Sequence, residues 1–237
     1  LYLLAIFKGA GHLFQTFLSI PYEAGVGVTL VIVMLYTSVG GFVSVVRTDV
    51  LQGILMLLGS VVIFYFVTQA AGGVTSITAL RDIPEKQFLF ELNGGIPFAV
   101  LLGVSLSGSL KLLADPRQLS RFYALKDEAA VRRGKWIATL GLAIVLSCLF
   151  PVGIYTHLIL PEVTDTDLIV PYLVSDPSVF PLWASDFLII AILAAAMSSM
   201  DSVLLVAAST LYRNVVSPFN ASSRELLWTR AAVVGFS

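Results

Sequence analysis

Residues 184–212 read ASDFLIIAILAAAMSSMDSVLLVAASTLY, and this stretch decides the fold class. It exceeds the roughly 20 mostly apolar residues that a helix needs to cross a bilayer, yet it carries a carboxylate, Asp201, near its middle. The whole chain shares this apolar character. Of its 237 residues 57% are hydrophobic and 12% charged, with a mean hydropathy of +0.92, whereas soluble domains are about 25% charged. We therefore predict an all-α fold, a polytopic membrane helical bundle.

The composition also excludes several classes of protein. A soluble enzyme of this size could not hide so much apolar surface in one core. The net charge of −1 gives no basic footprint, so we expect the lipid bilayer and no nucleic acid as a partner. The single cysteine, Cys148, excludes an internal disulfide and a cysteine-based zinc site.

Seven segments are apolar enough to be membrane spans. Pro21, Gly72-Gly73 and Pro161 lie at breaks between them, where turn chemistry is expected. Both ends of the chain fall inside apolar runs. We therefore interpret residues 1–237 as one transmembrane transporter domain that is truncated at both ends. The predicted spans are 1–20, 25–46, 49–70, 96–114, 136–160, 184–212 and 226–237.

Basic residues separate into alternate loops. Eleven of the 14 Lys and Arg fall in one set, six of them between Arg117 and Lys135. The positive-inside rule makes that set cytoplasmic, so the first span runs outward through what we expect to be the plasma (inner) membrane. The acidic segments 71–95 and 161–183 are then external, and we expect short helices in them.

Asp201 is the sharpest candidate for a functional residue. A charge at the bilayer centre costs about 2.5–3.5 kcal/mol on insertion scales, so an ionisable residue there suggests a function. Ala195, Ser198, Ser199 and Ser202 share one arc of about 100° on this helix, with Asp201 about 60° beyond Ser198. Oxygen atoms gathered in this way suit a hard cation such as Na⁺. The alternative is a small-residue seam between helices, with serines bonded to their own backbone.

Two further charged residues need an account. Asp49 follows Thr48 at the predicted start of a span. Either residue could cap the helix, or Asp49 could serve a buried site. Gln52, one turn further on, is expected to point into the span and to need a hydrogen-bond partner. Lys111 lies in the stretch GVSLSGSLK, 103–111. It could snorkel to the interface, pair with Asp115, or face a substrate from a broken helix.

Other catalytic patterns are missing from the sequence. Neither a nucleotide loop, nor a metal-binding His pair, nor a Ser/His/Asp set occurs, so we predict that the protein is not an enzyme.

Three stretches resemble the sodium:solute symporter family in order and spacing. Residues 36–53 (YTSVGGF…TDVLQG) resemble its Tyr-Thr-x-x-Gly-Gly and Thr-Asp-x-x-Gln run. Residues 115–124 (DPRQLSRFYA) resemble the loop of proline-type members. Residues 194–199 (AAAMSS) resemble its Ala-Ala-x-Met-Ser-Ser/Thr helix.

The resemblance implies a fold and a set of sites. The fold would be the LeuT-type arrangement of two inverted five-helix repeats, of which this chain covers about core helices 3–9. The main sodium site would use the carbonyl of Ala195 and the hydroxyls of Ser198 and Ser199. A second site, as in sialic-acid-type members, would join Asp49 to Asp201 and Ser202, with Asp201 standing where those members carry serine.

The resemblance also bears on the substrate. The stretch that lines the substrate in sugar-transporting members corresponds to Gly108, Lys111, Leu112 and their neighbours, without the expected Asn and Tyr. A sugar is therefore not expected, and Lys111 suits an amino acid or a carboxylate-like solute.

These observations lead to one functional prediction and two alternatives. We predict a secondary active symporter in which co-transported Na⁺ drives the import of a small organic solute. One alternative is the sensory input domain of a membrane sensor kinase. The other is a proton-coupled carrier that uses Asp201.

Overall fold

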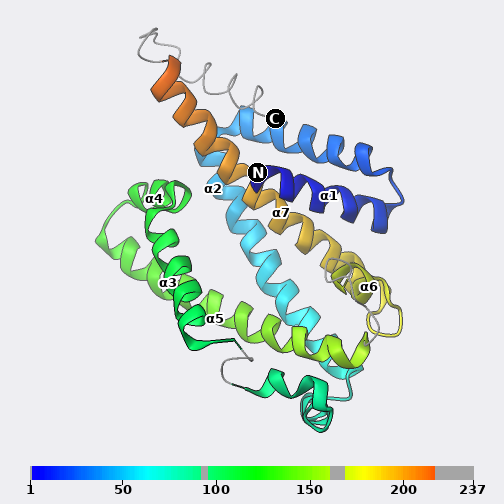
Figure 1. The fold of residues 1–237 in the computed structure, drawn as a ribbon. Coiled ribbons are helices and arrows are strands. Elements are labelled where there is room, and N and C mark those ends of the chain that lie inside the picture. The colour runs from blue at the N-terminus through cyan, green and yellow to red at the C-terminus, as the bar shows by residue number, and fades with distance from the viewer. Residues whose placement is uncertain (1, 92–95, 161–168, 217–237) are drawn as a thin grey trace. The chain divides into compact units, whose positions relative to one another are not determined.

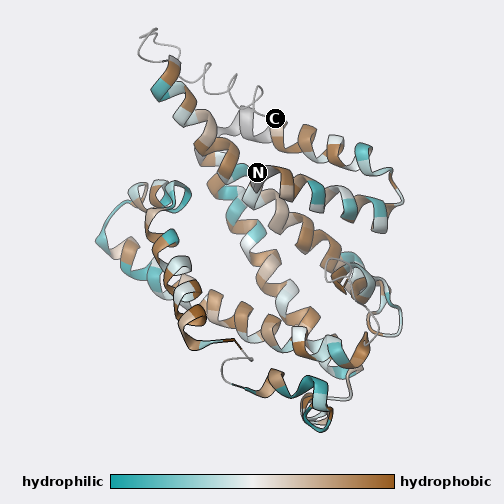
Figure 2. Ribbon diagram, viewed as in Figure 1, coloured by the Kyte–Doolittle hydropathy of each residue, from teal (hydrophilic) through white to brown (hydrophobic). Residues whose placement is uncertain are grey.

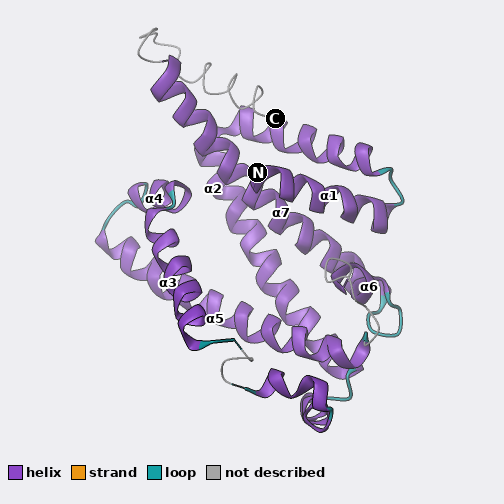
Figure 3. Cartoon of the chain, viewed as in Figure 1, coloured by secondary structure: helices purple, strands orange, loops and turns teal. Residues whose placement is uncertain are grey.

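In a computed structural model, residues 2–91, 96–160 and 169–216 are described, without the side chains of residues 2, 3, 36–42 and 216. Every regular element among them is helical, as Figure 3 shows, so the predicted all-α class is confirmed. The chain divides into two compact units, Leu1–Gly59 with Trp183–Ser237, and Ser60–Leu182. The elements of Figure 1 are α1 Tyr2–Leu18, α2 Tyr22–Ala70, η1 Val74–Asp82, η2 Pro84–Phe90, α3 Phe98–Ala114, α4 Pro116–Tyr123, α5 Glu128–Ile159, α6 Ile169–Ser175, α7 Leu182–Leu211 and η4 Tyr212–Val216.

The first turn of the chain brings α1 back against the start of α2. Ser19 takes a positive φ of 53° just before Pro21, and the two helices bend by 116° at this break. A glycine lies at the contact on each helix. A Cβ at Gly11 would lie 2.7 Å from the ring of Tyr22, and one at Gly25 would lie 2.6 Å from the Cβ of Phe14. The two backbones therefore approach as closely as they do because neither glycine has a side chain.

The longest helix, α2, corrects a predicted boundary. We expected separate spans at 25–46 and 49–70 with a boundary near residues 47–48, but the 49 residues of α2 are helical through these positions. The polar run Arg47-Thr48-Asp49 does not end it, because no Gly or Pro occurs between residues 42 and 52. The Thr48 hydroxyl donates to the carbonyl of Val45 (2.9 Å) within the helix and so continues it.

Several helices are long and apolar enough to cross a membrane. Within the described ranges three qualify alone: Val43–Ala70, Glu128–Ile159 and Leu182–Val215. The number reaches five if each of two bent pairs, Leu4–Leu18 with Tyr22–Leu35 and Phe98–Ala114 with Pro116–Tyr123, forms one span. Figure 2 shows apolar residues along the helices of both units. The predicted seventh span, 226–237, lies outside the described residues.

Three helices share the core of the first unit. Ala10 of α1, Val33 of α2, and Met200 and Leu204 of α7 form one apolar cluster, and all four side chains are fully buried. Burial of these side chains is what holds α7 against α1 and α2 in this unit.

The second unit places a short 3₁₀ hairpin against the end of α5. The Tyr155 hydroxyl donates to the carbonyl of Val74 (3.1 Å), and the Lys86 ammonium donates to Nδ1 of His157 (2.9 Å). The expected short helices are present in the segments 71–95 and 161–183 as η1, η2 and α6. The prediction of one domain over 1–237 stays a prediction.

Candidate cation and substrate sites

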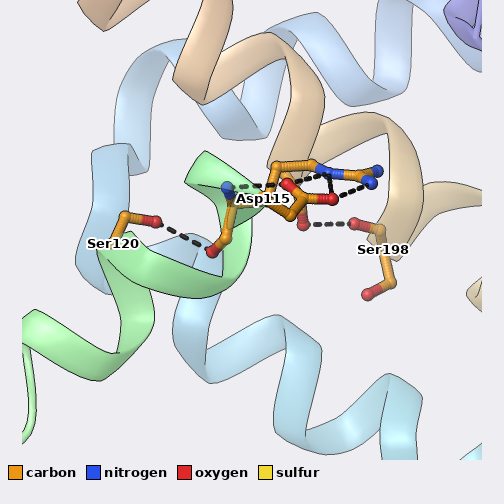
Figure 4. A network of polar contacts seen from close by, with 5 residues as sticks. Asp115, Ser120 and Ser198 are labelled. Carbon is orange, nitrogen blue, oxygen red and sulfur yellow. Dashed lines mark hydrogen bonds and ion pairs between the residues drawn. The ribbon is translucent and has the colours of Figure 1, made fainter. Parts of the chain in front are cut away.

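The best-defined polar contact of the first unit joins α2 to α7. The hydroxyl of Ser198 donates to Oδ1 of Asp49 at 2.6 Å, between residues 149 positions apart in the chain. Figure 4 shows this bond at the labelled Ser198. A short hydrogen bond to a carboxylate is stronger than one between neutral groups. The structure thus brings together two of the residues that the sequence singled out separately.

A second close contact fixes the direction of the two helices. A Cβ at Gly59 would lie 2.9 Å from the Cβ of Ala191, so α2 and α7 also touch there. From Asp49 to Gly59 the chain advances along α2, whereas from Ser198 to Ala191 it retreats along α7. The helices are therefore antiparallel along this seam. Gly59 was not predicted as a contact residue from the sequence, although small residues are typical of helix interfaces in membranes.

The acidic and hydroxyl groups of α7 lie at the buried side of the helix. Asp201 is fully buried and Ser202 is 8% exposed, whereas Ala195, Ser198 and Ser199 are half-buried. The Ser202 hydroxyl donates to the carbonyl of Ser198 (2.8 Å), as the seam interpretation predicted for serines. Ser198 departs from that interpretation, because its hydroxyl reaches across to another helix.

Asp49 does not cap a helix. The capping interpretation required a helix to begin at Thr48 or Asp49, but α2 is continuous through both. Asp49 lies in the middle of α2, where the backbone N–H groups are already used by the helix. Its carboxylate is therefore available to side chains of α7.

Gln52 lies one turn after Asp49. Its side chain is 9% exposed, and no described residue donates a hydrogen bond to its Oε1 atom. The expectation that it points inward is confirmed. Within the described residues, no group of three His, Cys, Asp or Glu could hold a metal ion. The candidate ligands are therefore a mixture of carboxylate, hydroxyl and amide oxygens rather than a cluster of three acidic or histidine side chains.

The three predicted substrate residues lie on α3 in the second unit. Gly108, Lys111 and Leu112 are all exposed. Their role in substrate binding stays a prediction.

Of the alternatives for Lys111, an ion pair with Asp115 is not formed between these described residues. Asp115 instead caps α4 and forms its ion pair with the guanidinium of Arg117 (2.5 Å), as Figure 4 shows around Asp115. The N–H groups of Arg117 already saturate this carboxylate. The bond to Arg117 lowers the pKa of Asp115 from 3.8 to about 2, and Lys111 adds only a weaker attraction.

Comparison with known proteins agrees with the motifs. The model of the family described as "Sodium:solute symporter family" matches residues 1–235. The chain belongs to the sodium:solute symporter family. The chain is 28% identical over 211 residues to the sodium/pantothenate symporter of Haemophilus influenzae, covering 88% of this chain and 43% of that protein.

Other relatives within this symporter family are named for a second solute. The osmoregulated proline transporter OpuE of Bacillus subtilis is 31% identical, covering 92% of this chain and 45% of its own length. The sodium/proline symporter of Escherichia coli is 26% identical, covering 94% and 46%. The chain thus spans about half the length of the curated relatives it matches. No solved structure matches it.

Proposed function

We propose that this chain is part of a sodium-coupled secondary active transporter of the plasma membrane that imports a small organic solute. The observation that carries the proposal is the bond between Ser198 and Asp49 in the seam between α2 and α7. A carboxylate and a hydroxyl held together in a membrane protein form the core of a cation site. Membership of the sodium:solute symporter family supports Na⁺ as the ion.

The remaining oxygens divide into two groups. The carbonyl of Ala195 and the hydroxyls of Ser198 and Ser199 would serve a first Na⁺. Asp49, Asp201 and Ser202 would serve a second. The two carboxylates together balance the charge of two bound Na⁺, which lowers the cost of holding the ions away from water.

The ion would act on the transport cycle by joining helices. The hydroxyl of Ser198 donates its proton to Asp49 and keeps its lone pairs, with which it would bind Na⁺. Because the ion bridges α2 and α7, it stabilises the conformation in which the two helices are close, and this differential binding couples the ion to solute uptake. A membrane potential adds about 2.3 kcal/mol per charge for each 100 mV.

The proposed solute is an amino acid or a carboxylate-like compound. The ammonium of Lys111 on α3, with Gly108 and Leu112 beside it, would attract a carboxylate. Relatives of this chain are named for proline and for pantothenate, and both compounds carry a carboxylate.

The test is uptake of radiolabelled proline and pantothenate by the complete protein in proteoliposomes with an imposed Na⁺ gradient. We expect uptake of one of them to depend on external Na⁺. Ser199→Ala and Asp49→Asn should raise the Na⁺ concentration needed for half-maximal uptake at least tenfold. Asp127→Asn is the matched control, because this carboxylate caps α5 in the other unit. Uptake that ignores Na⁺, or that Ser199→Ala and Asp49→Asn leave unchanged, contradicts the proposal.

A proton-coupled carrier is the second candidate. The observation that favours it is the complete burial of Asp201, an ionisable side chain near the middle of an apolar helix. Uptake driven by a pH gradient in Na⁺-free buffer, and abolished by Asp201→Asn, would support this candidate. Absence of uptake under those conditions excludes it.

A further inference from the structure

The buried side chain of Gln52 has no role in the proposed function. The side chain is 9% exposed, and its Oε1 atom accepts no hydrogen bond from any described residue. Leaving a buried acceptor without a donor costs about 1–3 kcal/mol. An amide oxygen in this position therefore has an unused capacity to bind a positively charged or hydrogen-bond-donating ligand.

The register of α2 places Gln52 on the seam with α7. At about 100° per residue, Gln52 lies about 20° from Gly59 around the helix axis and about 60° from Asp49. Gly59 faces Ala191 of α7, and Asp49 accepts from Ser198 of α7. Gln52 lies between these two contacts along α2 and shares their face. Its amide is therefore in the same antiparallel seam as the Asp49 carboxylate.

The spacing also suits a shared ligand. Side chains three residues apart on a helix have Cβ atoms about 5–6 Å apart, so an Asp and a Gln at this spacing can contact one ion. Side-chain amide oxygens serve as ligands for hard cations beside carboxylates and hydroxyls. The amide oxygen carries no net charge, so it adds a ligand without making the site more negative.

We propose that Gln52 supplies its Oε1 atom to the Na⁺ that Asp49 holds, and so sets the affinity of that site for Na⁺. This inference rests on the proposed function, because it assumes that a cation binds at the seam. It adds a ligand from α2 that neither the motif resemblance nor the hydrogen bonds had assigned. Gln52 also lies on the same helix as Asp49, so α2 would supply two ligands to the ion, one helical turn apart.

The experiment measures Na⁺-dependent uptake by the complete protein, and ²²Na⁺ binding without solute. Gln52→Leu removes the oxygen and should raise the Na⁺ concentration for half-saturation about tenfold in both measurements, with the KM for solute unchanged at saturating Na⁺. Gln52→Glu returns an oxygen with a charge and should restore Na⁺ affinity to the wild-type value or better. Gln52→Asn retracts the oxygen by one methylene and should weaken Na⁺ binding.

Thr68→Val is the matched control. Thr68 is a buried residue of the same helix, and no described residue bonds its hydroxyl, but it lies in the second unit. We expect its half-saturation for Na⁺ to stay within twofold of wild type. If Gln52→Leu does not fold, the opposed changes in Gln52→Glu and Gln52→Asn decide the question.

The outcomes separate this inference from the proposed function. If Asp49→Asn weakens Na⁺ binding and the Gln52 variants do not, the Gln52 inference is wrong and the symporter proposal stands. If Gln52→Leu raises the KM for solute and leaves Na⁺ binding unchanged, the amide serves the solute or another part of the protein, and the inference is again wrong. If neither Asp49→Asn nor Ser199→Ala changes Na⁺ binding or Na⁺-dependent uptake, the cation site itself fails.

Discussion

Helices α7 of the first unit and α5 of the second are both apolar enough to cross a membrane, but they bury different amounts of surface. One third (33%) of the most apolar window of α7 is buried, against 6% of that of α5. The buried positions of α7 include Ala184, Ala191, Ala194 and Ala208, whereas α5 exposes large side chains such as Phe150. Figure 2 shows apolar residues along both helices, so hydropathy does not separate them.

The difference lies in side-chain size and in where oxygen atoms occur. Small residues let α7 approach its neighbours closely, and the hydroxyl of Ser198 then meets the carboxylate of Asp49 on α2. Large aliphatic and aromatic residues keep neighbouring backbones at a distance and suit contact with an apolar surrounding. A helix that carries alanines, serines and an aspartate is therefore a packing and binding helix, even where its hydropathy is that of a lipid-facing one.

The largest expected difference comes from deleting a leucine in each unit. Leu204→Ala should reduce the free energy of unfolding by about 2–5 kcal/mol, because Leu204 is fully buried in the cluster with Ala10, Val33 and Met200. Leu106→Ala on α3 should change it by at most about 0.5 kcal/mol, because Leu106 is 53% exposed. Thermal unfolding of the purified protein in detergent measures both. Equal destabilisation by the two variants would remove the contrast between the units.

A bulkier side chain at the seam should come next. Gly59→Val places new atoms against Ala191, where a Cβ alone would be 2.9 Å away, and should destabilise the protein by about 1–3 kcal/mol. Gly141→Val in α5 is the control, because no described atom lies within 4 Å of the corresponding Cβ position. The same unfolding assay compares them. A Gly59→Val protein as stable as Gly141→Val would show that α2 and α7 are not in contact there.

The polar contact should have a smaller effect on binding. Ser198→Ala removes the hydroxyl that bonds Asp49 and should weaken Na⁺ binding about tenfold, or about 1.4 kcal/mol. Ser109→Ala removes an exposed hydroxyl of α3 that bonds only its own helix at Ser105, and should change Na⁺ binding less than twofold. Binding of ²²Na⁺ to the purified protein measures the two variants. A Ser198→Ala protein that binds Na⁺ like wild type would contradict the site.

The smallest expected effect at neutral pH is that of Asp115 at the N-cap of α4. Asp115 has a pKa of about 2 in the folded protein, below its ordinary 3.8, because it is bonded to Arg117. The lowered pKa means that ionised Asp115 stabilises the fold fully above pH 3.8, and that this stabilisation is lost as the pH falls through 2. The difference in stability between wild type and Asp115→Asn should therefore be constant from pH 5 to 8 and disappear towards pH 2. A difference that varies between pH 5 and 8 would contradict the assignment.

The residues of the candidate site could be predicted from the sequence more completely than the boundaries of the helices. Periodicity placed Ser198 and Ser202 on one face, and membrane energetics singled out Asp201. The contact between Ser198 and Asp49 could not be predicted from the residues alone, because pairing across 149 positions depends on how two helices pack. The family resemblance did link Asp49 to this stretch of α7.

Helix boundaries were harder to predict. Three consecutive polar residues, Arg47, Thr48 and Asp49, were interpreted as a break between spans, but polarity does not end a helix without a residue that breaks its hydrogen bonds. The contact at Gly59 could not be predicted, because a single glycine in an apolar run does not indicate which residue it faces. Asp115 pairs with Arg117 and not with Lys111. At the N-cap of α4 its carboxylate accepts from the backbone N–H of Arg117, two positions on, and the guanidinium of Arg117 is then also within reach.

The two bonds that hold the 3₁₀ hairpin to α5 span 81 and 71 residues, from Val74 to Tyr155 and from Lys86 to His157. During biosynthesis the hairpin therefore leaves the ribosome long before its partners exist. At about 5–20 residues per second, the delay is about 4–16 seconds. Over that interval the carbonyl of Val74 and the ammonium of Lys86 lack their partners on α5. Docking must follow the insertion of α5, which makes this contact one of the last steps in assembling the second unit.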